Sequence, residues 1–204
     1  MSPYEARLKR ICANRKNPIS FDSLSLIDTL NKEFKPERIY FELMRQEGRD
    51  LIQGSIDRKN LRIYIEVGVL RLANDPTDKL INRFIECIQH EMIHREQMVR
   101  SGGKLKFFIP PEDVEHIDAD TLSKYYNDKS ELMAYSIETV TILRHEGYTD
   151  NQILAMVKYP KKFDVKIEKS EAHLAEYIRA FGVNSPQYKK FVTTVYQYIT
   201  GEQK

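Results

Sequence analysis

Two histidines and a glutamate near the middle of the chain form the pattern H-E-x-x-H, in which His90 and His94 are one helical turn apart. Residues four apart on a helix lie about 40° from each other, so both imidazoles can bind one divalent metal ion. Glu91 lies about 100° round the helix, beside such an ion, where a carboxylate can accept a proton from a bound water. The spacing therefore predicts a zinc site with an adjacent general base. The alternative is a solvated helix face on which these residues pair with charged neighbours.

A third protein ligand distinguishes a catalytic zinc site from an ordinary helix face. The pattern with a third histidine at position 100 is excluded, because Gln97 and Arg100 stand where its glycine and histidine would be. Glu131, expected in the first turn of a later helix, would complete a His₂Glu set and leave the fourth position to water. Its alternative role is a capping box with Asp128. The other candidate ligands are Glu112, Glu115, His116, Asp118 and Glu138.

The periodicity of the apolar residues predicts the elements that position these side chains. Apolar residues recur with helical spacing over 78–100, the segment that carries the motif, and Ser101-Gly102-Gly103 ends it. Residues 61–67 alternate as a strand does, and a turn at 57–60 joins them to a strand at 51–56. A third strand is expected at 39–44. Further helices are expected within 1–35 and at 130–145, 151–158, 170–181 and 186–200, with a long irregular segment at 104–128.

Length and composition indicate a single domain spanning residues 1–204. The formal charge of +2 is too small to indicate nucleic acid or an anionic membrane as a partner, and the basic patch at 158–162 has too little charge around it to change this. Cys12 and Cys87 make no disulfide framework. The first residues lack the apolar core of a signal peptide, and no apolar run is long enough for a membrane span. We therefore expect a cytoplasmic protein.

Residues 67–138 resemble the core of the gluzincin metallopeptidases. The resemblance rests on a strand, the helix bearing H-E-x-x-H, a connecting segment and a helix that opens on Glu131-x-x-Ala134. The chain is similar to the small, minimal members of that group, and loosely to the ImmA/IrrE type. The resemblance implies a zincin-like core at about 38–146. The periodicity predicts helices before it and a helical extension at 149–204, so the expected fold is α+β and mostly helical, with a small antiparallel sheet.

In the gluzincins the two histidines and the distal glutamate hold zinc, which implies these roles for His90, His94 and Glu131, and the motif glutamate is the general base, which implies that role for Glu91. Larger members have an aspartate four residues after the third ligand, where this chain has Tyr135. A tyrosine there could donate a hydrogen bond to an oxyanion, as could those at 125 and 126. Their alternative role is ordinary amphipathic packing.

We expect a zinc metallopeptidase, a hydrolase that cleaves peptide bonds through a metal-activated water, with Glu91 as general base and Tyr135 as a second catalytic residue. The expected partner is a peptide or protein substrate, which would add to the sheet edge presented by the strand at 61–67. Neither nucleic acid nor a membrane is expected as a partner, and the sequence leaves the oligomeric state open. The alternative function is a non-catalytic scaffold or virion-type structural protein that retains a zincin-like core.

Overall fold

The computed structural model describes residues 7–8, 10–11, 23–46, 52–57, 59–68, 77–104, 124–170 and 172–202. Two compact units divide the chain, Met1–Lys104 and Leu105–Lys204. The single domain expected from the length stays a prediction, because compactness of each half does not decide whether the halves fold together.

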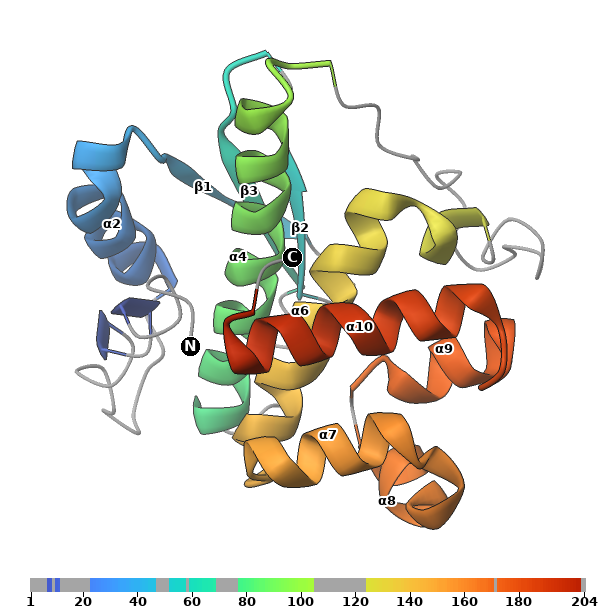
Figure 1. The fold of residues 1–204 in the computed structure, drawn as a ribbon. Helices are drawn as coiled ribbons and strands as arrows, with labels where there is room; N and C mark the ends of the chain where they lie inside the picture. Colours follow the sequence, from blue (N-terminus) through green and yellow to red (C-terminus); the bar gives the residue numbers. More distant parts are fainter. Residues whose placement is uncertain are drawn as a thin grey trace. The chain divides into compact units, whose positions relative to one another are not determined.

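The first unit packs α-helices against a three-stranded sheet (Figure 1). The described residues at 7–8 and 10–11 are helical as well. All three predicted strands are present within a residue or two of their expected bounds. The long helix over the H-E-x-x-H motif is confirmed. The elements in chain order are α2 (Ser23–Phe34), the 3₁₀ turn η1 (Lys35–Glu37), β1 (Phe41–Gln46), β2 (Ile52–Ile56), β3 (Ile63–Gly68) and α4 (Thr77–Arg100).

The sheet is mixed, which corrects the predicted antiparallel one. Its strand order is β1-β3-β2, with β3 antiparallel to β2 and parallel to β1. A tight turn makes β2 and β3 a hairpin: the Asp57 N–H donates to the Arg62 carbonyl at 2.9 Å, and the Leu61 N–H donates to the Asp57 carbonyl at 2.8 Å. The other side of β3 is taken by β1. Because β3 is paired on both sides, the prediction that the strand at 61–67 presents a free edge to a peptide is wrong.

One face of this sheet carries the core of the unit, and α2 and α4 cover that face. Ile63, Ile65 and Val67 alternate along β3 and are fully buried, as the period-two pattern predicted. They pack with the apolar stripes of α2 and α4, so α2 lies against β1 while α4 lies against β2 and β3 (Figure 1). This packing positions α4 along the strand hairpin.

The start of β1 is held by a side chain that imitates a neighbouring strand. The Asn31 side-chain amide of α2 donates to the Phe41 carbonyl at 2.9 Å, and its oxygen accepts from the Phe41 N–H at 2.7 Å. Both backbone polar groups of Phe41 are thereby satisfied on the side that faces away from β3. The amide fixes α2 to the sheet by hydrogen bonds as well as by apolar packing.

The second unit is helical throughout its described residues. The predicted helices at 130–145, 151–158 and 186–200 are confirmed. The predicted helix at 170–181 is present but begins four residues later, at Leu174, because Ser170 is extended and its hydroxyl accepts from the Ala172 N–H. A short helix that ends at Lys169 was not predicted. The elements are α6 (Lys129–His145), α7 (Asp150–Lys158), η3 (Pro160–Lys162), α8 (Asp164–Lys169), α9 (Leu174–Phe181) and α10 (Pro186–Thr200).

Buried tyrosines tie the helices of the second unit together. The Tyr177 hydroxyl donates to the Tyr126 carbonyl at 3.0 Å while its ring stacks on Phe191, and the Tyr188 hydroxyl donates to the Val157 carbonyl at 2.9 Å. Each ring fills the core while its hydroxyl donates a hydrogen bond to a backbone carbonyl. Burial raises the pKa of both hydroxyls above the usual range.

The described part of the fold is therefore α+β and mostly helical, as predicted. Most of the first predicted helix and residues 105–123 of the predicted irregular segment lie outside the described residues, together with Cys12, Glu112, Glu115, His116 and Asp118. Among the described helices, none combines the length and the apolar composition that a membrane crossing requires.

Candidate functional site

The two histidines of the motif face each other on α4. Their Nε2 atoms are 3.0 Å apart, with His94 buried and His90 half-buried. Two N–H groups cannot point at each other at this distance, so at least one nitrogen presents its lone pair. Two nitrogens bound to one zinc at about 2.1 Å would be roughly 3.4 Å apart. The pair therefore needs to move by only a few tenths of an ångström to share a metal ion.

The other ring nitrogen of His94 has a partner that selects the tautomer of the neutral ring. His94 Nδ1 lies 3.1 Å from Oε1 of Gln97, three residues further along α4. An amide oxygen only accepts, so the proton of a neutral ring lies on Nδ1 and the lone pair lies on Nε2. Metal-binding histidines are commonly oriented by such a second hydrogen bond. Sequence reasoning treated Gln97 only as a departure from another motif, although its i, i+3 spacing from His94 was visible.

Glu91 points from α4 toward β2, where it meets a glycine. The side chain of Glu91 is 6% exposed. A Cβ atom added at Gly54 would lie 2.9 Å from the Glu91 carboxyl carbon and 2.9 Å from its Oε1. Only glycine at this position of the strand leaves room for the carboxylate. Gly54 was missed in the sequence, although a glycine inside a strand is a known sign of a close approach.

In the second unit, Glu131 lies buried in the first turn of α6. Asp128 is the N-cap of this helix, and its side chain accepts from the Ser130 N–H at 2.8 Å. A capping box would require the Asp128 N–H to donate to Glu131, but that N–H donates to the carbonyls of Lys124 and Tyr125 at 3.1 Å. The alternative role of Glu131 as the return partner of a capping box is thus not realised.

Tyr135 belongs to a cluster of rings one turn after Glu131. Its hydroxyl is 3.0 Å from the Tyr125 hydroxyl, and its ring lies edge-on to His173 with centroids 4.5 Å apart. Burial, and after it the nearby Tyr125, raises the pKa of Tyr135 well above its usual range, so its hydroxyl keeps its proton and can donate. Glu138, an alternative ligand candidate, lies 3.7 Å from His173 Nε2.

The structure thus places His90, His94 and Glu91 together on α4 in the first unit, and Glu131 with Tyr135 on α6 in the second. The three predicted ligands offer two ring nitrogens and a carboxylate oxygen, which is a donor set that zinc binds. Cys87, one turn before the motif, is partly buried and packs against the core of the first unit. No model of a known protein family, no curated protein and no solved structure matches this chain.

Proposed function

We propose that this protein is a zinc-dependent metallopeptidase of the minimal gluzincin type, with a zincin-like core. One observation carries the proposal: the Nε2 atoms of His90 and His94 face each other at 3.0 Å while Gln97 holds the remaining ring nitrogen of His94. Two imidazole nitrogens that face each other, with one ring oriented by a hydrogen bond at its other nitrogen, are typical of a metal site. In this proposal Glu131 supplies the third ligand, and the fourth position belongs to water and substrate.

Bound zinc would supply a strong positive charge that polarises the scissile carbonyl and lowers the pKa of a water toward ~7. Glu91 then acts as the general base. It accepts one proton from the water as the oxygen adds to the carbonyl carbon, and it delivers that proton to the amide nitrogen as the C–N bond breaks. Its place beside Gly54, off the face of the two histidines, suits a group that moves protons and does not bind the metal.

Tyr135 has the complementary role in the proposal. A protonated hydroxyl can donate a hydrogen bond to the carbonyl oxygen as negative charge develops on it. The raised pKa keeps this donor intact over the whole neutral range. Tyr125, whose hydroxyl contacts that of Tyr135, orients it.

The substrate class follows from the strand next to Glu91. Among the described strands β2 is at the sheet edge beside α4, and the carboxylate of Glu91 lies against its central residue, Gly54. An extended peptide that adds to this edge by main-chain hydrogen bonds would run past the general base. We therefore propose β2, and not β3, as the strand that an unfolded or extended polypeptide substrate joins.

The decisive experiment compares the parent with Glu91→Gln in zinc-loaded protein, using a library of fluorogenic peptides. Glutamine keeps the shape of the side chain but cannot accept the proton, so hydrolysis should fall by about two to four orders of magnitude. Zinc content and thermal stability should stay at the parent level. Glu96→Gln, the same change at a half-buried residue of α4 that pairs with Arg100, should leave hydrolysis unchanged.

Equal rates for Glu91→Gln and the parent would remove the assigned mechanism. If neither protein cleaves any peptide while both hold zinc, the scaffold alternative replaces the peptidase. Tyr135→Phe extends the comparison: loss of the hydroxyl should lower kcat by about a hundredfold with little change in KM, because the hydrogen bond strengthens only as the carbonyl oxygen gains charge.

A further inference from the structure

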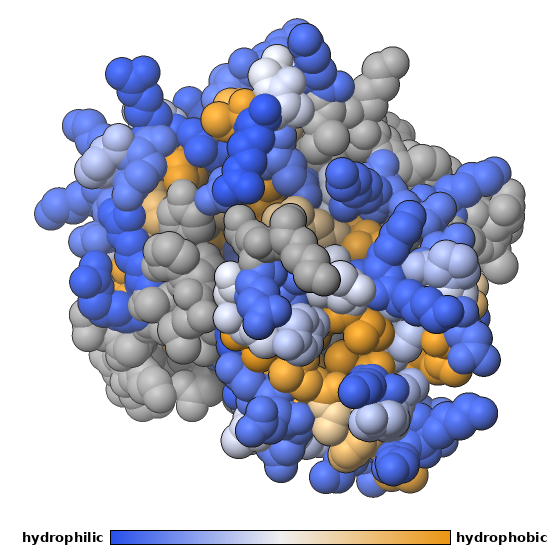
Figure 2. All heavy atoms as spheres, in the orientation of Figure 1, coloured by the Kyte–Doolittle hydropathy of each residue, from blue (hydrophilic) through white to orange (hydrophobic). Residues whose placement is uncertain are grey.

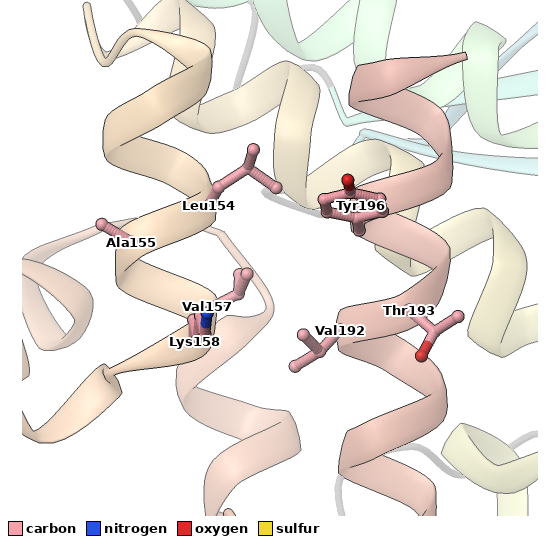
Figure 3. Close-up of a pocket in the computed structure, with 7 residues that line it drawn as sticks. All are labelled: Leu154, Ala155, Val157, Lys158, Val192, Thr193 and Tyr196. Atoms are coloured by element: carbon pink, nitrogen blue, oxygen red, sulfur yellow. The ribbon is translucent and has the colours of Figure 1, made fainter. Parts of the chain in front are cut away.

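An apolar groove lies between α7 and α10, entirely within the second unit (Figure 3). Its volume is about 470 Å³, within the range of roughly 300–1,000 Å³ that is usual for ligand sites. Leu154 faces Tyr196 across the groove, and Val157 faces Val192 (Figure 3). The lining is completed by Ala155, Lys158 and Thr193.

The groove is part of a larger apolar surface. In the space-filling view, hydrophobic side chains gather where α7 and α10 run, with hydrophilic residues around them (Figure 2). Tyr196 at the groove is 45% exposed, and Tyr159 at the end of α7 is 48% exposed. Large side chains left this open to water, beside an apolar hollow, are typical of a surface that a partner covers.

The two helices run in opposite directions along the groove. The Tyr188 hydroxyl near the start of α10 donates to the Val157 carbonyl near the end of α7. At the other end, Arg144 contacts both Asp150 at the start of α7 and the ring of Tyr198 late in α10. The end of α7 and the start of α10 therefore form the same end of the groove.

Positive charge gathers at that end. Lys158 lines the groove, and its ammonium group and that of Lys162 lie 5.3 and 5.2 Å from the centre of the Tyr159 ring. Lys189 is one turn before Val192 and Thr193 on the face of α10 that lines the groove. At the opposite end Asp150 is already paired with Arg144 at 2.9 Å. The groove is thus apolar along its length and basic at one end only.

We propose that this groove binds an amphipathic α-helix of a partner protein, with apolar side chains in the groove and carboxylates at the lysine end. The charge pattern identifies the partner's chemistry: Lys158 and Lys189 on the lining faces, with Lys162 next to them, call for negative charge at one end, whereas Asp150 at the other end is paired with Arg144. The length fits a short helix. α7 has nine residues, or about 13 Å, which matches two to three turns laid alongside it.

The openness of the groove favours a helix over a single acyl chain. Buried small-molecule ligands usually lose 70–90% or more of their surface to the protein, which requires walls on most sides. Here the hollow is a channel between two surface helices, and its flanks carry half-exposed tyrosines. A third helix would fill the space between α7 and α10 and cover both rings.

The test uses the full chain and a synthetic peptide of about 14 residues, with leucines at helical i, i+3, i+4 and i+7 spacing and three glutamates at one end. Fluorescence anisotropy measures its affinity, and amide chemical shifts of the ¹⁵N-labelled protein locate it. We expect shifts at Leu154, Val192 and Tyr196. The same peptide with lysines in place of the glutamates should bind at least about tenfold more weakly.

Protein variants separate the groove from general surface charge. Lys158→Glu combined with Lys189→Glu should weaken the glutamate peptide at least about tenfold, and both side chains are exposed, so folding is preserved. Lys169→Glu combined with Lys190→Glu makes the same change of charge away from the lining faces and should leave affinity within about twofold. Val192→Glu tests whether the apolar lining of the groove contributes to peptide affinity, and its thermal melting curve shows whether this variant is folded.

Three results would overturn the proposal. The first is equal binding by the Lys158→Glu, Lys189→Glu protein and the parent. The second is a set of shifts outside α7 and α10. The third is that something other than the peptide occupies the groove. Either sodium dodecanoate changes the amide chemical shifts of the groove residues while the peptide does not, or the protein self-associates and the Lys158→Glu, Lys189→Glu variant does not. None of these results depends on zinc or on hydrolysis.

Discussion

The carboxylate of Glu91 occupies the space beside Gly54 in which any other residue would carry its Cβ atom. The helix α4 and the strand β2 therefore pack closely at Glu91, the residue that we propose as general base. Glu91 is 6% exposed, so the atoms packed around its side chain hold it in this position. The glycine therefore determines where the base stands, without itself providing any chemical group.

Replacing Gly54 by alanine should displace Glu91 and leave the histidines in place. The added Cβ would come within 2.9 Å of the carboxylate, so the side chain must shift. A displacement of about 1 Å can cost about a hundredfold in rate. We expect peptide hydrolysis to fall by that order while zinc content stays at one ion per chain. Ser55→Ala, on the exposed face of the same strand, is the control and should match the parent. A fully active Gly54→Ala protein would contradict this placement of the base.

The third ligand can be identified by competition with a chromogenic zinc chelator. Glu131→Ala should weaken zinc binding, as should His90→Ala and His94→Ala, because each removes one donor from a proposed three-residue set. Glu138→Ala is the matched control on the same helix, since Glu138 lies near His173 and was a rival candidate. The assignment fails if Glu131→Ala binds zinc like the parent and Glu138→Ala does not.

Gln97 should control zinc affinity through His94. Gln97→Leu removes the acceptor for Nδ1, which leaves the ring free to turn and to carry its proton on the nitrogen that faces His90. Losing such a partner usually costs 10- to 100-fold in metal affinity. Gln97→Glu keeps an acceptor at the same place and should retain the parent affinity. Equal affinities for the leucine and glutamate variants would show that the contact has no such role.

Buried tyrosines should make the second unit sensitive to alkali. Burial raises the pKa of Tyr126 to about 12 and that of Tyr188 further, whereas unfolded tyrosines ionise near pH 10. Above pH 10 the unfolded chain therefore binds fewer protons than the native one, and the free energy of unfolding falls as pH rises. Each such tyrosine contributes up to about 1.4 kcal/mol per pH unit in that window.

Urea unfolding at pH 9 and pH 11 measures this effect. Tyr188→Phe should reduce the difference between the two pH values, and at neutral pH it should cost about 1 kcal/mol for the lost hydrogen bond to Val157. Tyr159→Phe, at a half-exposed ring, should leave the pH dependence unchanged. An identical pH dependence for the parent and Tyr188→Phe would contradict the assignment.

The features that the sequence predicted are those set by local spacing. The one-turn separation of His90 and His94 placed both rings on one helix face, and the Nε2 distance of 3.0 Å agrees with it. Ser185-Pro186 and Gly201 bound α10 because a hydroxyl cap, a proline in the first turn and a left-handed glycine are local devices. Such signals need no knowledge of the remainder of the chain.

The features that could not be predicted from the sequence depend on residues that are distant in the chain. Alternation in β1 is the same whether its neighbour is parallel or antiparallel, so the direction of the strand pair could not be inferred. Gly54 becomes informative only once α4 is known to pack against β2. The later start of α9 depends on Ser170, which is extended and whose hydroxyl accepts from the Ala172 N–H.

The Asn31 amide that holds Phe41 also bears on how chains of this protein meet one another. An unpaired strand edge can recruit a strand from another copy, and repeated recruitment leads to fibres. At the beginning of β1 the outward N–H and carbonyl are already bound to a side chain of the same molecule. An incoming strand would have to displace both bonds before gaining any of its own. Asn31 therefore protects the β1 edge of the sheet against strand addition by another copy. The β2 edge, which we propose binds substrate, is the one that would accept a strand.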